Sequence, residues 1–151
     1  MSVAPEITRA ILEEELEAMA PLGSLHDWKV ALNLEALTVT VRMTSSVDGE
    51  EYILEAQCDN YKEWPPHFEF IHPHTEERGS RHCYPHGGSF FHDHPCICVQ
   101  WNRKTYIDGP HRDWQLATWQ NERPHMTYLG DMFSLVQMEI NKKGQYQGRK
   151  R

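Results

Sequence analysis

Two thiols separated by a single residue are the chemically most informative feature of this sequence. Cys96 and Cys98 lie in the apolar run His94-Pro-Cys-Ile-Cys-Val99. A thiolate is a strong nucleophile, so this segment could present a reactive cysteine. Alternation along an extended chain would place both side chains on the same side. The residues alone therefore leave both cysteines as candidate nucleophiles.

The sequence also offers ligands for a metal ion around this pair. Nine of the ten histidines lie between His67 and His125. The candidate zinc ligands are His82, Cys83, His86 and His92. Cys-x-Cys with scattered histidines does not match the spacing of a standard zinc finger, which uses Cys-x2-Cys pairs. A structural zinc in the histidine-rich loop is thus an alternative hypothesis, and no other cofactor is expected.

A proline-rich segment upstream is expected to position the cysteines. It reads Tyr61-Lys-Glu-Trp-Pro-Pro-His-Phe-Glu-Phe-Ile-His-Pro73. Two consecutive prolines make a rigid turn, and the alternation of Phe68 and Phe70 predicts a short strand over 67–71. Cys58, just before this segment, has the features of a small buried apolar residue.

The remaining elements are expected to form a sheet flanked by helices. Alternating apolar residues predict strands over 28–34, 37–43 and 51–57. Helical spacing predicts a first helix over 5–19, with Pro21 beyond its end. A short helix is predicted over 113–120 with Trp114 and Trp119 inward, and a last helix over 127–140 with Thr127 as N-cap. The segments 74–93 and 102–112 show no period and predict loops. Strands followed by helices are typical of an α+β domain with helices on an antiparallel sheet.

Length and charge narrow the class of protein. A chain of 151 residues favours one domain, which we assign to 1–141, followed by a basic, flexible tail over 142–151. The formal net charge of -7 argues against nucleic-acid binding. We find no signal peptide and no apolar run long enough to span a bilayer. We therefore expect a cytoplasmic protein without a membrane partner, whose cysteines are reduced.

The order of these motifs resembles the ubiquitin-conjugating enzyme (E2) family. Members carry a Tyr-Pro-x-x-Pro-Pro-x-x-x-Phe segment after the third strand, then Ile-Cys-Leu, a downstream tryptophan and Thr-Leu at the start of a helix. The matching segments here are 61–73, Ile97-Cys98-Val99, Trp114 or Trp119, and Thr127-Tyr-Leu129. The likeness spans about 5–140. The histidines and the tryptophan-rich insertion look most like divergent bacterial E2-like proteins, which are encoded in conjugation operons, including antiphage operons.

This resemblance implies a fold and a function. The E2 fold has an N-terminal helix, a four-stranded antiparallel meander, a long active-site loop with the catalytic cysteine, and C-terminal helices. The implied enzyme accepts a ubiquitin-like protein from an activating enzyme as a thioester and transfers it to a lysine of a target protein. The Ile-Cys-aliphatic match favours Cys98 as nucleophile, with Cys96 as the alternative or as a helper thiol.

Other site residues follow from the resemblance. The family's His-Pro-Asn motif lacks its asparagine here, so an oxyanion donor must be sought among His86, His94 and Asn102. Asp113 or Asp108 could activate the incoming lysine. The alternatives are a catalytically inactive E2 or RWD-type interaction module and a zinc-stabilised domain built on histidine and cysteine.

Overall fold

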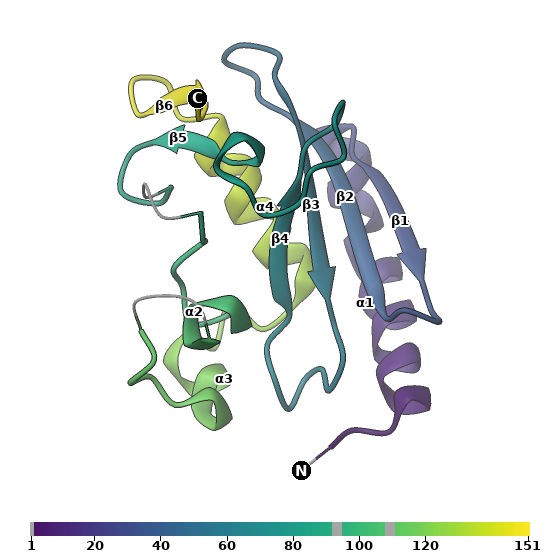
Figure 1. Ribbon diagram of the computed structural model, residues 1–151. Helices are drawn as coiled ribbons and strands as arrows, with labels where there is room; N and C mark the ends of the chain where they lie inside the picture. Colours follow the sequence, from purple (N-terminus) through teal and green to yellow (C-terminus); the bar gives the residue numbers. More distant parts are fainter. Residues whose placement is uncertain (1, 92–94, 108–110) are drawn as a thin grey trace.

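The protein is an α+β domain in which helices cover one face of an antiparallel sheet. A computed structural model describes residues 2–91, 95–107 and 111–151 (Figure 1). The elements in chain order are α1 (Pro5–His26), β1 (Lys29–Asn33), β2 (Thr38–Thr44), β3 (Glu51–Gln57), β4 (His67–Ile71), the 3-10 helix η1 (Arg81–Cys83), β5 (Pro85–Gly87), α2 (Arg103–Ile107), η2 (Leu116–Thr118), α3 (Trp119–Glu122), α4 (Leu129–Ile140) and β6 (Tyr146–Arg149). The predicted N-terminal helix, four-stranded sheet and C-terminal helices are all present.

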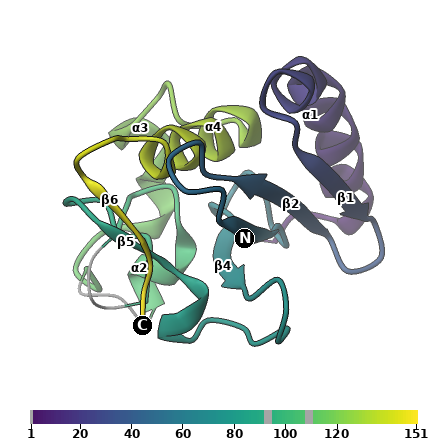
Figure 2. The same cartoon turned by 90° about the horizontal axis from the view of Figure 1, so that it is seen from above.

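The main sheet is a meander with the order β1-β2-β3-β4. Its register places Val41 opposite Leu54 and Leu54 opposite Phe70, so apolar side chains line one face. Those three side chains are fully buried. Figures 1 and 2 show α1 and α4 on this same face, which explains why alternate residues of β2, β3 and β4 are buried. Of the predicted strands, those over 51–57 and 67–71 have the predicted bounds.

Helix α1 is longer than the sequence predicted. It continues through Pro21 to His26, whereas the prediction ended it at Met19. Proline removes one helical hydrogen bond, but burial of an apolar face can outweigh that cost. Met19 is buried, and both it and Leu22 lie close to Gly130 of α4, so the extra turn extends the contact between the two helices.

The start of α4 is held by α1, not by the predicted cap. Tyr128 occupies the N-cap position and makes no side-chain cap bond. The Thr127 hydroxyl instead donates to the Pro124 carbonyl at 3.2 Å. The Leu129 amide donates to Glu15 Oε1 of α1 at 2.8 Å, which satisfies one of the free amides of the first turn. The Thr127 prediction is therefore wrong, because a buried carboxylate from another element supplies the acceptor.

The segments predicted as loops contain short regular elements. The 74–93 segment includes η1 and β5, and the 102–112 segment includes α2. The short helix expected over 113–120 is replaced by η2 and α3. Trp119 points inward as predicted and donates from Nε1 to the Lys62 carbonyl at 3.1 Å. Trp114 is only half-buried and stacks on His111.

The basic C-terminal segment is folded, in contrast to the predicted flexible tail. Its strand β6 pairs antiparallel with β5, and the two lie side by side in Figures 1 and 2. Tyr146 and Lys150 are buried. The Tyr146 hydroxyl lies 2.6 Å from that of Tyr52 in β3, so an aromatic anchor overrides the solvation expected of a charged chain end. Across the described residues, no helix is long and apolar enough to cross a membrane.

Candidate active site

The two cysteines of the central pair have different environments. Cys96 is buried, whereas Cys98 is half-buried. The alternation expected from an extended strand does not apply, because the segment is irregular and Ile97 makes only an isolated bridge with Phe91. The remaining cysteines, Cys58 and Cys83, are also buried. All four thiols are among the described residues, and Cys98 is the one that is not buried.

Asn102 holds the cysteine segment against the sheet. Its Nδ2 donates to the Ile97 carbonyl at 2.8 Å, and its Oδ1 accepts from the Phe68 amide of β4 at 2.9 Å. Thr105 of α2 donates to the same Ile97 carbonyl at 3.0 Å. Because Asn102 is fully buried and engaged in these bonds, its observed role is to fix the residue that precedes Cys98. The prediction that it donates to an oxyanion gains no support from this placement.

The electrostatic environment favours the thiolate of Cys98. A hydrogen bond from the Cys96 thiol and, more weakly, the positive charge of Lys150 lower the pKa of Cys98 from its ordinary value of 9.0 to about 7, against the opposing effect of burial. The same hydrogen bond holds the proton on Cys96 and, together with desolvation, raises the pKa of that thiol. In its neutral form the Cys98 thiol donates to the Cys96 carbonyl at 3.7 Å, and the Cys96 thiol lies 3.9 Å from the Thr105 hydroxyl.

An acidic cavity lies beside the cysteine segment. It has a volume of about 320 Å³ and includes Gln100, two residues after Cys98. Its other lining residues are Tyr106, Asp113, Trp114, Gln115, Thr118 and Glu122. The Tyr106 hydroxyl donates to the Gln100 carbonyl at 2.6 Å, and burial, followed by the charge of Glu122, raises its pKa to about 12. Aromatic walls with two carboxylates suit a side chain that has an apolar stem and a cationic end.

Asp113 and Glu122 line this cavity together with Gln100, and the role of Asp113 in activating a lysine stays a prediction. His86 is half-buried in β5, next to Gly87, which pairs with Phe91, the partner of Ile97. His92, His94 and Asp108 lie outside the described residues. Cys58 is fully buried, which confirms the small apolar role predicted for it.

The described members of the predicted zinc set, His82, Cys83 and His86, do not form a metal site. No group of three or more histidine, cysteine, aspartate or glutamate side chains in the described part of the chain could hold a metal ion. His82 is exposed, whereas Cys83 is buried and donates to the Glu77 carbonyl at 3.2 Å. The Cys83 thiol thus has a hydrogen-bonding role within the loop.

Sequence reasoning missed Lys150, Tyr106 and Glu122. Lys150 was assigned to a solvated tail, although Tyr146 nearby was a signal that the segment docks. Tyr106 lay in a segment without periodicity, and it was missed because α2 is too short to show a helical pattern.

Comparison of the chain with protein-family models, with curated proteins and with solved structures finds no match. Among the described residues, the structure thus shows an α+β domain with one partly exposed thiol, Cys98, two residues before a residue that lines an acidic cavity.

Proposed function

We propose that this protein is an E2-like conjugating enzyme. It accepts a ubiquitin-like protein from an activating enzyme as a thioester on Cys98 and transfers it to a lysine of a target protein, in a bacterial antiphage conjugation system. The observation that carries the proposal is the contrast between the two thiols: Cys96 is buried, whereas Cys98 is partly exposed within the Ile-Cys-aliphatic segment. The lowered pKa of Cys98 supports it.

The first chemical step is a thiol exchange. The Cys98 thiolate attacks the carbonyl carbon of the thioester that joins the modifier to the activating enzyme. A new C–S bond joins the modifier to Cys98, the C–S bond to the activating enzyme breaks, and the activating enzyme's cysteine leaves as a thiolate. A pKa near the working pH suits this exchange, because a much lower pKa would weaken the nucleophile.

The second step transfers the modifier to an amine. The lysine nitrogen attacks the same carbonyl, a C–N bond forms, the C–S bond breaks, and Cys98 leaves as a thiolate while the amine loses a proton. The cavity with Asp113 and Glu122 supports this step, because carboxylates can orient a lysine ammonium and accept its proton. His86 and His94 stay candidate donors to the oxyanion.

Thioester capture tests the proposal. The protein is incubated with ATP and with a cognate activating enzyme and ubiquitin-like protein, and the products are separated on a non-reducing gel. We expect an adduct that a thiol reductant removes, that Cys98→Ala abolishes and that the matched variant Cys83→Ala retains. An adduct that survives Cys98→Ala and disappears in Cys96→Ala would move the site to Cys96. No adduct at all would favour an inactive interaction module.

A further inference from the structure

The two edges of the main sheet are covered to different degrees by the rest of the described chain. At the β4 edge, the Phe68 amide donates to Asn102 Oδ1 at 2.9 Å, and the Phe70 carbonyl accepts from the Gly79 amide at 3.0 Å. At the opposite edge, β1 pairs only with β2, and Figure 1 shows none of the described elements beyond it. Every second residue of β1 therefore directs its amide and carbonyl away from the sheet.

Strand β1 also lacks the features that usually block pairing at an exposed edge. Proline, inward-pointing charges and bulges normally serve that purpose. The segment Lys29–Asn33 contains no proline, and its register with β2 has no shift. Its one charged residue is Lys29, at its start, and the apolar side chain of Val30 is 40% exposed. The strand is thus open to an added strand.

An apolar groove lies between this open edge and helix α1, which the two cartoon views show side by side (Figures 1 and 2). The groove has a volume of about 500 Å³. Its apolar lining comes from Leu16, Met19, Ala20, Trp28 and Val30. The Trp28 ring is fixed from behind, because its Nε1 donates to Gln137 Oε1 of α4 at 2.8 Å. One wall of the groove is therefore rigid before any ligand binds.

The α1 side of the groove is acidic. Asp27 lines the groove, and Glu13 and Glu17 are exposed on α1 one turn before two of its lining residues. Pairing of β1 with β1 of a second copy, about a twofold axis, would place both α1 helices on the same face of the joined sheet. Their carboxylates would then repel one another. The charge therefore favours a different partner, with basic groups on the side that faces the groove.

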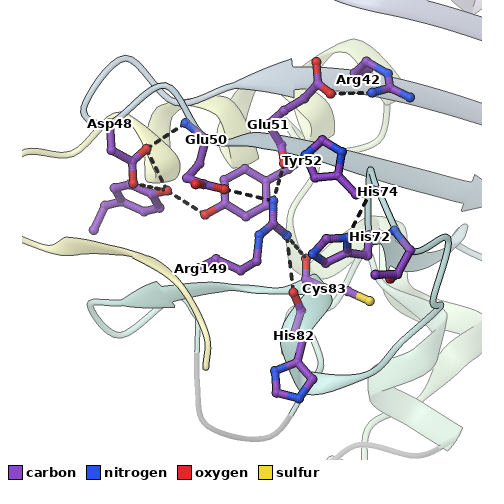
Figure 3. A network of polar contacts seen from close by, with 12 residues as sticks. Arg42, Asp48, Glu50, Glu51, Tyr52, His72, His74, His82, Cys83 and Arg149 are labelled. Atoms are coloured by element: carbon purple, nitrogen blue, oxygen red, sulfur yellow. Dashed lines mark hydrogen bonds and ion pairs between the residues drawn. The ribbon is translucent and has the colours of Figure 1, made fainter.

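The other face of the sheet carries the opposite charge at this edge. Lys29 is exposed, and it makes none of the ion pairs found among the described residues. Arg42, its partner in the β1–β2 register, is instead neutralised by Glu51, as Figure 3 shows. An added strand would meet a cation on this face and carboxylates on the groove face.

We propose that β1 and the adjoining groove bind an extended segment of a partner protein by strand addition. Main-chain hydrogen bonds to β1 hold the segment, and its side chains alternate between the two faces. Those that face the groove are apolar or basic, and those on the Lys29 side are polar or acidic. Because the cysteine segment is held at the β4 edge by Asn102, this surface is separate from the thiol, and the proposal does not depend on the proposed function.

A designed peptide tests the strand addition. The probe is Lys-Glu-Val-Thr-Ile-Glu-Val-Thr-Lys with blocked ends, titrated into the full-length, ¹⁵N-labelled protein. We expect saturable binding and, for alternate amides within 29–33, hydrogen exchange about tenfold or more slower. Two N-methylated isomers serve as matched controls, one methylated on the amides of Val and Ile and the other on those of Glu and Thr. One isomer loses the donors that face β1 and should bind about tenfold or more weakly than the other. Equal affinities of the two isomers, or no saturable binding of the parent peptide, would overturn the proposal.

A pair of variants locates the site. Val30→Glu removes an apolar contact from the groove and should weaken peptide binding about tenfold or more. Val47→Glu changes a side chain of similar exposure, 39%, on the turn between β2 and β3 and should leave the affinity unchanged. Equal effects of the two changes would contradict the assignment. Sedimentation equilibrium without peptide should show a monomer. A dimer that Val30→Glu dissociates would assign the edge to a second copy and overturn the proposal.

Discussion

Replacing Cys96 by alanine should change the reactivity of Cys98 in opposite directions at low and high pH. The hydrogen bond from Cys96 is the largest influence that lowers the pKa of Cys98 from 9.0 to about 7. Cys96→Ala removes the donor, and the pKa of Cys98 is expected to return toward its ordinary value. Because Cys96 is buried and small, alanine leaves little empty space.

The magnitude follows from two opposing effects. At pH 7 a thiol with a pKa of about 7 is about half ionised, and one with a pKa of 9.0 is about 1% ionised, so full reversal lowers the thiolate fraction about 50-fold. The more basic thiolate is about 6- to 10-fold more nucleophilic in disulfide exchange. The net result is a rate about 5- to 8-fold lower at pH 7. At pH 10, where both forms are ionised, the variant should react about 6- to 9-fold faster.

Disulfide exchange with dithiodipyridine, followed by absorbance and localised by mass spectrometry, measures both rates. Cys83→Ala is the matched control, since it removes a buried thiol whose hydrogen bonds go to Glu77 and Ser80 and not to Cys98. A change in accessibility alone would scale the rate equally at every pH. A Cys96→Ala profile that is parallel to the wild-type profile would therefore refute the proposed hydrogen bond.

Three further predictions concern the frame of the site and the acceptor cavity. Glu15→Ala should lower the free energy of unfolding by about 2–4 kcal/mol in urea denaturation, because the buried Tyr61 hydroxyl and Leu129 amide lose their acceptor. Removing the more exposed ion pair of Glu139 should lower it by about 1 kcal/mol or less, and equal losses would contradict this prediction. Asn102→Ala should lower the free energy of unfolding by about 2 kcal/mol or more in the same urea denaturation, since the Ile97 carbonyl and the Phe68 amide lose their partner. An unchanged denaturation midpoint would argue against the anchoring role of Asn102. Asp113→Asn should slow transfer of the modifier from the thioester to free lysine about 10- to 100-fold in a single-turnover assay, and it should leave thioester formation unchanged. An equal slowing of both steps would exclude a role of Asp113 confined to the transfer to lysine.

The sheet could be predicted because its signal is local. Each strand over 51–57 and 67–71 buries alternate residues, so a two-residue period in the sequence reports the buried face. The end of α1 could not be predicted in the same way. Pro21 is a strong local stop signal, and only the contact between Leu22 and Gly130 of α4 shows why the helix continues.

The site could be predicted only in part. The Ile-Cys-aliphatic pattern indicated Cys98, and the structure makes it the accessible thiol. The unequal burial of Cys96 could not be foreseen, because it depends on an irregular backbone held by Asn102 from another part of the chain. Lys150 was hidden for a similar reason. A charge near a chain end usually indicates solvation, and its burial here follows from the docking of Tyr146 against Tyr52.

The most direct test of the account is the location of the modifier on the protein. After reaction with ATP, the activating enzyme and the ubiquitin-like protein, the intact mass should rise by that of the modifier less one water. Peptide mapping should place the modifier's terminal carbonyl on Cys98 through a bond that hydroxylamine cleaves. A modifier attached at another residue, or no mass increase with an active activating enzyme, would contradict the claim that Cys98 carries a thioester.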